Sequence, residues 1–155
     1  MRGPSRWLST LVLASVLVTA RAAPADVGGL DLRPYAGKVV VVDFWASWCQ
    51  PCRRSFPWLN EMTSRYGDRG LVVLAVNTDT EASDADRFLR EVPARFAIIR
   101  DPAGQLATHY HLPGMPVSLI FGTSGQLLRT HVGFREADRS TREAELTHLL
   151  DEAKR

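Results

Sequence analysis

Both cysteines of this 155-residue chain lie in one tetrapeptide, Cys49-Gln50-Pro51-Cys52. Thiols separated by two residues can close a disulfide with little backbone movement. Because the chain has no other cysteine, this is the only intramolecular disulfide that it can form. A pair of this kind at the start of a helix that follows a strand is typical of a redox centre. The alternatives are a static structural disulfide and part of a zinc site, but a closed zinc site needs about four ligands and no second ligand pair with suitable spacing is present.

The position of each thiol along the predicted helix distinguishes their roles. Cys49 opens the helix, where unpaired backbone N–H groups and the helix dipole favour an anion and so lower the pKa of a thiol. Because thiolate is the attacking form in disulfide exchange, we assign Cys49 as the attacking residue and Cys52 as the resolving residue. We expect Cys52 to be the more buried of the two and Trp48 to keep one side of the site apolar.

A βαβ unit is predicted to position the pair. The β-branched run Val39–Phe44 predicts a strand that is buried on both faces. Apolar residues at helical spacing predict a helix from Cys49 to about Arg65, and Leu71–Asn77 predicts a second buried strand. The two strands are therefore expected to be parallel, with a right-handed crossover.

The remaining elements predict an α/β fold with a mixed central sheet and helices on both of its faces. A helix and a strand are inserted between the βαβ unit and a C-terminal hairpin. The predicted elements are a helix from Ser83 or Asp84 to about Glu91, a strand at Phe96–Ile99, a helix at Gln105–Tyr110, a hairpin of Val117–Phe121 and Leu127–Val132, and an amphipathic helix from Asp138 to about Ala153.

Residues 1–22 have the features of a secretory signal. Arg2 and Arg6 precede an apolar run from Leu8 to Ala20, and a small-x-small pattern ends at Ala22. This predicts an exported, periplasmic protein, and the alternative is an uncleaved anchor in the inner membrane.

The mature domain is predicted to comprise residues 23–155. Cleavage after Ala22 removes three of the 19 basic residues and leaves 16 against 17 acidic residues. Because no basic run remains, nucleic acid is not expected as a partner.

Asp43 is a carboxylate within an otherwise apolar strand. Burial of a carboxylate is unfavourable unless it is paired or protonated. Burial also raises the pKa, which suits a general base for a thiol. The alternative is an aspartate that points to solvent at the end of the strand.

The segment from Val41 to Arg53 (VVDFWASWCQPCR) resembles the active-site signature of the thioredoxin superfamily. The resemblance extends to Pro57 within the helix and to Gly114-Met115-Pro116-Val117, which resembles the segment that holds the cis-proline of that family. The inserted helix and strand, together with the export signal, are similar to the TlpA/ResA-like extracytoplasmic thiol–disulfide oxidoreductases. A thioredoxin fold for residues 23–155 is what the resemblance implies.

The resemblance also implies roles for individual residues. Asp43 matches the buried aspartate that serves in proton transfer at the second cysteine, so the catalytic set is Cys49, Cys52 and Asp43. Many TlpA/ResA-like proteins carry a glutamate three residues after the second cysteine, where this chain has Ser55.

A second set of residues is expected to contact the substrate. Pro116 is expected in the cis form, which leaves the backbone of Met115 free to pair with an extended substrate segment. The expected substrate-binding residues are Trp48, Gln50, Pro51, Met115 and Pro116.

The resemblance implies a thiol–disulfide oxidoreductase that reduces partner proteins such as apocytochromes or copper-site proteins. A membrane thiol donor would supply the electrons, and we expect a monomer without cofactor or metal. The absence of histidine between the cysteines resembles reducing members more than strong oxidants. The alternatives are a disulfide oxidase or isomerase and, from another class, a copper metallochaperone; a peroxidase fits the cysteine pattern less well.

Overall fold

A five-stranded mixed sheet forms the centre of the computed structural model, which describes residues 26–27 and 29–155. Its order is β5-β4-β3-β6-β7. The strands are β3 (Val39–Trp45), β4 (Leu71–Asn77), β5 (Ala97–Arg100), β6 (Val117–Phe121) and β7 (Leu127–Val132). Strands β3, β4 and β5 run parallel, whereas β6 pairs antiparallel with β3 and with β7. The predicted mixed sheet is confirmed.

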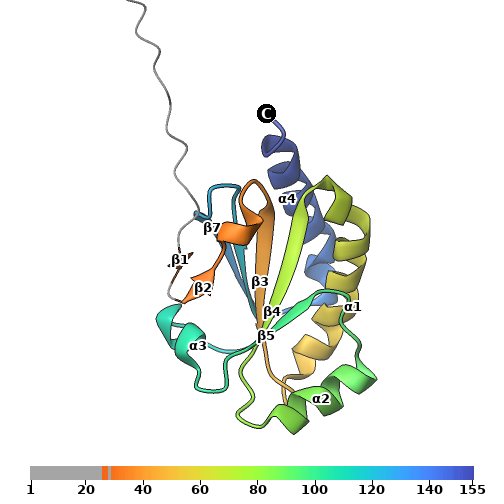
Figure 1. Ribbon diagram of the computed structural model, residues 1–155. Coiled ribbons are helices and arrows are strands. Elements are labelled where there is room, and N and C mark those ends of the chain that lie inside the picture. The colour runs from red at the N-terminus through yellow and green to blue at the C-terminus, as the bar shows by residue number, and fades with distance from the viewer. Residues whose placement is uncertain (1–25, 28) are drawn as a thin grey trace, which may run out of the picture.

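Helices cover both faces of the sheet (Figure 1). One face carries α1 (Gln50–Tyr66), α2 (Ala82–Glu91) and α4 (Arg139–Glu152). The other carries α3 (Gln105–His109), with the small β1–β2 hairpin and a 3₁₀ turn beside it. These last elements are β1 (Asp26–Val27), β2 (Leu30–Asp31) and η1 (Arg33–Tyr35). Two further 3₁₀ turns are η2 (Gly67–Arg69) and η3 (Glu136–Asp138).

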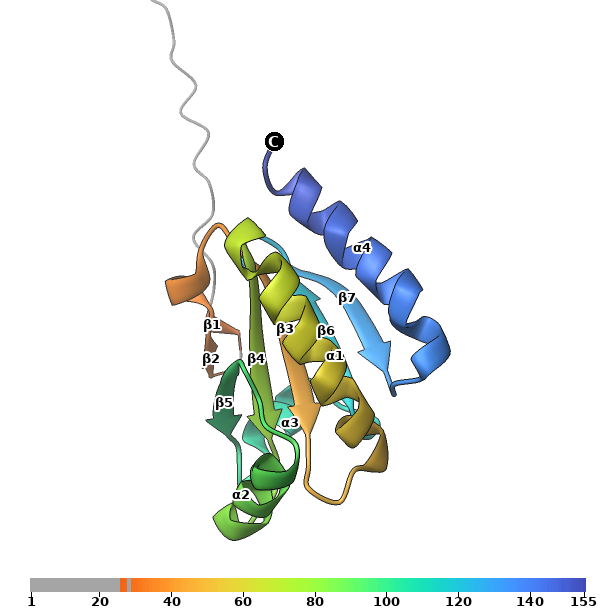
Figure 2. The same cartoon turned by 90° about the vertical axis from the view of Figure 1, so that its right-hand side faces the viewer.

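Strand β3 is buried along its whole length because both of its faces are covered. Side chains alternate across a strand, so Val40 and Val42 pack into the cluster on the α3 side. Val39 and Val41 pack on the other side, with apolar residues of α1 and α4. Asp43 continues this second series and therefore lies on the face of the sheet that α1 and α4 cover. Figure 2 shows these two helices in front of the sheet.

Three local features differ from the sequence-based expectations. Helix α2 begins at Ala82, with Glu81 as its N-cap, rather than at Ser83 or Asp84. A 3₁₀ turn precedes α4, which starts at Arg139. The β1–β2 hairpin was not predicted, because its strands have two residues each and show no periodicity.

The predicted signal, residues 1–22, lies outside the described part of the chain. Among the helices of the described residues, none has the length and apolar character that crossing a membrane demands.

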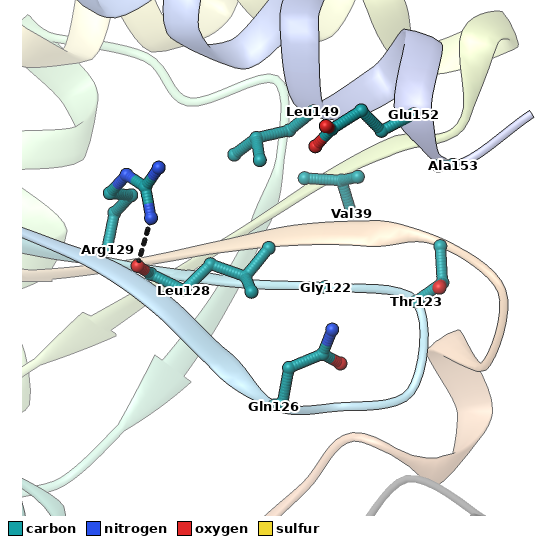
Figure 3. A pocket seen from close by; sticks show the side chains of 9 residues that line it. All are labelled: Val39, Gly122, Thr123, Gln126, Leu128, Arg129, Leu149, Glu152 and Ala153. Atoms are coloured by element: carbon teal, nitrogen blue, oxygen red, sulfur yellow. Dashed lines mark hydrogen bonds between the residues drawn. The ribbon is translucent and has the colours of Figure 1, made fainter.

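A hollow of about 300 Å³ lies at the start of β3, between the β6–β7 turn and the end of α4 (Figure 3). Its lining includes Val39, Thr123, Arg129 and Glu152. Cys49 follows the opposite end of β3, so this hollow takes no part in the site described next.

Candidate active site

The two cysteines form a disulfide at the N-terminus of α1. The sulfurs of Cys49 and Cys52 are bonded, and their Cα atoms lie 5.3 Å apart. Cys49 is the N-cap of α1, and its sulfur accepts a hydrogen bond from the backbone N–H of Cys52 at 3.2 Å. This N–H lies in the first turn of the helix and also donates to the carbonyl of Cys49 at 3.2 Å. Its position allows it to stabilise a thiolate on Cys49 after reduction.

Cys52 is the more buried of the two cysteines, as predicted, but the difference is small. Cys49 is 2% exposed and Cys52 is 0% exposed, because an aromatic cluster surrounds both. Trp45, Phe56 and Phe88 form this cluster, with ring centroids 4.7 to 5.1 Å apart. The order of attack therefore rests on the helix N-terminus, which favours Cys49, rather than on exposure.

Trp48 is the exposed apolar residue of the site. It is 70% exposed, beside the nearly buried Cys49. Tryptophan is enriched at protein–protein interfaces, so an exposed Trp48 beside the cysteines suits a contact with a protein substrate. It lines a hollow of about 330 Å³ together with Arg53 and Arg87.

The loop that carries Trp48 is fixed by Asp79, which the sequence analysis did not single out. Both carboxylate oxygens of the buried Asp79 accept hydrogen bonds from the backbone N–H of Ser47, at 3.1 and 2.9 Å. The Ser47 hydroxyl donates to the same carboxylate at 2.9 Å, and Asn77 donates at 2.8 Å. Arg100 donates to the Asn77 side chain at 3.0 Å, which connects β5 to this network. The inserted α2–β5 segment thus supports the loop that precedes the disulfide.

Asp43 is fully buried, as the apolar strand predicted. Its Oδ1 accepts a hydrogen bond from the Ser118 hydroxyl at 2.6 Å, across the β3–β6 ladder. Its Oδ2 has no hydrogen-bond partner among the described residues. Burial raises the pKa of Asp43 to about 7, although the Ser118 hydrogen bond and the charge of Arg142 act to lower it. A carboxyl with this pKa and a free oxygen can accept or donate a proton near neutral pH.

The predicted cis bond is present at Met115–Pro116. Met115 packs against the cluster that contains both cysteines, which places the start of β6 beside the disulfide. Gln50 is exposed and Pro51 is half-buried, each in the first turn of α1. The predicted contact residues therefore lie in two segments of the chain, residues 48–51 at the start of α1 and residues 115–116 just before β6.

Ser118 and Asp79 were not predicted as site residues, although each has a signal in the sequence. Ser118 is the single polar residue in the strand VSLIF, and it lies opposite Asp43. Asp79 follows a buried strand closely, but its partner Ser47 is 32 residues away. For metals, no group of three or more His, Cys, Asp or Glu that could hold an ion occurs in residues 26–27 and 29–155.

Comparison with known proteins places this arrangement in a family. Residues 18–131 match the AhpC/TSA family, which is more than half of the chain. The chain belongs to the AhpC/TSA family. Within it, the chain is 25% identical over 100 residues to thiol–disulfide oxidoreductase ResA of Bacillus thuringiensis subsp. konkukian. This alignment covers 64% of the chain and 58% of that relative, so the chain spans less than two thirds of the relative's length.

Solved structures of similar proteins have the same fold as this chain. A putative thiol:disulfide interchange protein DsbE from Chlorobium tepidum is 45% identical, with a TM-score of 0.75, and the match covers 83% of this chain and 92% of that one. The exposed lipoprotein thioredoxin Etrx1 from Streptococcus pneumoniae is 30% identical, with a TM-score of 0.63 and coverage of 74% and 88%. The thioredoxin fold and the similarity to TlpA/ResA-like proteins are therefore confirmed.

Proposed function

We propose that this protein is a thiol–disulfide oxidoreductase that reduces disulfides in partner proteins. The observation that carries the proposal is the Cys49–Cys52 disulfide at the N-terminus of α1, with a backbone N–H directed at the sulfur of Cys49. The relatives named ResA and DsbE support the activity, because their names describe the same chemistry.

The reaction begins with the reduced dithiol. The Cys49 thiolate attacks one sulfur of the substrate disulfide, a mixed disulfide forms, and the first substrate thiolate leaves. The Cys52 thiolate then attacks the sulfur of Cys49 and releases the second substrate thiolate. The protein gives up two electrons and forms the Cys49–Cys52 disulfide, while the substrate disulfide becomes two thiols. An external thiol donor must then reduce the pair again.

Asp43 is proposed to accept the proton of Cys52. A thiol in an apolar cluster holds its proton, because burial disfavours the thiolate. The carboxyl of Asp43, with a pKa raised to about 7, is half ionised near neutral pH and can receive this proton. Its unpartnered Oδ2 is the available acceptor atom.

The substrate is proposed to bind over the surface next to Cys49, and the nearly buried disulfide lies just beneath it. Trp48, Gln50 and Pro51 form one side of this surface, and Met115 and Pro116 form the other. An extended substrate segment can pair with the backbone of Met115 and present its disulfide to Cys49. Burial of Trp48 by the substrate would add apolar contact area, since its side chain is 70% exposed in the free protein.

The proposed setting is the periplasm, reached through a signal in residues 1–22 or retained there by an uncleaved anchor. An exposed lipoprotein among the structural neighbours supports an extracytoplasmic location. Because disulfides form readily there, a reductase needs electrons from a membrane thiol donor. Apocytochromes and copper-site proteins are the proposed substrates of a monomeric protein made of residues 23–155.

The test is a stoichiometric exchange with the reduced protein. We expect mixing with insulin, whose disulfides report reduction, to form one Cys49–Cys52 disulfide for each insulin disulfide lost. Mass spectrometry of acid-quenched, alkylated samples counts the thiols on both proteins. Reduced protein that keeps both thiols in the presence of excess insulin disulfide would contradict the proposal.

A further inference from the structure

Arg142 is a buried cation on the face of α4 that packs on the sheet. It lies four residues before Leu146, which places it on the apolar face of the helix. Its side chain is only 10% exposed, whereas Arg139, one turn earlier, is 40% exposed. Arginine is seldom buried without partners, so its placement under the sheet calls for a physical explanation.

The contacts of Arg142 lead toward the active site. Its guanidinium donates a hydrogen bond to the carbonyl of Gly133 at 2.8 Å, and the N–H of Gly133 donates to the carbonyl of Pro116 at 2.8 Å. The guanidinium also lies 5.6 Å from the ring centroid of Phe134. Its carboxylate contact, with Asp138, is long at 3.9 Å, so the positive charge is only partly neutralised.

A small cavity joins Arg142 to the residue that holds Asp43. This cavity of about 10 Å³ is lined by Arg142, Ser118, His131 and Trp58, among other residues. Ser118 is the residue whose hydroxyl donates to Asp43. Arg142 and Ser118, the hydrogen-bond partner of Asp43, therefore border the same space between the sheet and α4.

We propose that Arg142 is a positioning residue whose buried guanidinium is the counter-charge that allows Asp43 to ionise inside the protein. A cation near a buried carboxyl stabilises the carboxylate, and the low polarity of the interior strengthens this effect. Each group acts on the other: the charge of Arg142 lowers the pKa of Asp43, and the charge of Asp43 raises the pKa of Arg142. Arginine remains charged at neutral pH, so this contribution does not change over the working range.

The other titratable groups around this space act in both directions. His131 on β7 bonds to Glu145 on α4 at 2.8 Å, and burial lowers the pKa of His131, which favours its neutral form. Glu145 and Asp138 are acidic and oppose the effect of Arg142. From α1, Cys52 is held in the disulfide and does not titrate in the oxidised protein. Strand β4 presents the neutral Ala75 opposite Asp43. Arg142 is thus the residue whose charge acts on the pKa of Asp43.

This inference rests on the proposed role of Asp43 as the proton acceptor, and the experiment separates the two. The carboxyl carbon of Asp43 is followed by ¹³C NMR in the oxidised full-length protein, where neither cysteine titrates, and Asp43→Asn identifies the signal. The pH profile of insulin reduction is measured in parallel for each variant.

Arg142→Met is expected to raise the titration midpoint of Asp43 by roughly one unit and to shift the alkaline rise of the pH profile by a similar amount. Arg142→Lys keeps the charge, so its Asp43 midpoint is expected to stay close to that of wild type. Arg139→Met removes a cation from the exposed part of the same helix and is expected to leave both readouts unchanged.

The outcomes are distinct. An Asp43 midpoint within about 0.2 units of wild type in folded Arg142→Met would overturn the inference and leave the proposed function intact. An equal shift in Arg142→Lys and Arg142→Met would also overturn it, because it would indicate a packing effect rather than a charge effect. If Arg142→Met does not fold, Arg142→Lys and Arg142→Gln provide the same comparison. An activity profile that Asp43→Asn does not alter would instead contradict the proposed role of Asp43.

Discussion

Cys49→Ser is expected to reduce the rate of insulin reduction to the uncatalysed background, a loss on the order of 10³ or more. The serine hydroxyl has the same position at the helix N-terminus, but it is a far weaker nucleophile than a thiolate at neutral pH. The measurement is the rate of insulin precipitation in the presence of dithiothreitol, with the circular dichroism spectrum as a check on folding.

Cys52→Ser is expected to lose the second step of the reaction rather than the first, and its overall turnover also falls. Cys49 can still attack, but no second thiol remains to release the substrate. A mixed disulfide with the substrate is therefore expected to accumulate and to be visible as a covalent adduct on a non-reducing gel. Each variant is the matched control of the other. Adducts in Cys49→Ser but not in Cys52→Ser would reverse the assignment of the two roles.

Asp43→Asn is expected to stabilise the protein at alkaline pH. The pKa of Asp43 is about 7 in the folded protein against 3.8 for an ordinary aspartate. Below pH 3.8 the carboxyl is protonated in both states and the native fold bears no penalty. As the pH rises from there to about 7, the unfolded chain ionises first, so stability is lost, and above pH 7 the full loss remains.

At pH 8 the free energy of unfolding of Asp43→Asn is expected to exceed that of wild type by about 4 kcal/mol, which follows from the difference between the two pKa values. Urea unfolding at several pH values between 4 and 8 measures it. The gain of Asp43→Asn over wild type should shrink toward zero as the pH falls to 4. Asp68→Asn, at an exposed position in η2, is the matched control and should show little change. A gain that is constant over the whole pH range would mean that Asp43 does not titrate as described.

Asp43→Asn is also expected to slow catalysis, because it removes the proposed proton acceptor of Cys52. The carboxyl that destabilises the fold at alkaline pH is thus the one that the reaction uses. Loss of a general base costs typically about 10²-fold in rate. The rate of insulin reduction should also lose its rise around pH 7, since no carboxyl is left to ionise there. An unchanged rate and pH profile would remove Asp43 from the mechanism.

The elements that hold the cysteines could be predicted from the sequence because their signals are local. The β-branched run of β3 and the apolar run of β4 each indicate a strand buried on both faces, and Cys49 and Cys52 lie in sequence between them. A single carboxylate within the apolar run of β3 was sufficient to predict that Asp43 is unusual, and the structure confirms that it is buried.

What the sequence did not reveal are contacts between distant residues. Ser118 lies 75 residues from Asp43, and nothing local indicates that a serine in β6 bonds to it. Arg142 could have been noticed as a cation on the apolar face of α4, but its connection to Pro116 through Gly133 requires the fold. The expected difference in burial between the cysteines has the predicted direction but is small, because both pack in an aromatic cluster that α1, α2 and β3 form together.

The reduction potential of the Cys49–Cys52 pair, measured by equilibration with glutathione or dithiothreitol, tests the central claim most directly. A reducing centre predicts a value near or below about −250 mV, in the range of thioredoxin. With such a potential, the proposed reductase would need an external thiol donor to supply the electrons that it passes to substrate disulfides. A value near about −120 mV would instead describe a strong oxidant and would contradict the reductive direction proposed for this site.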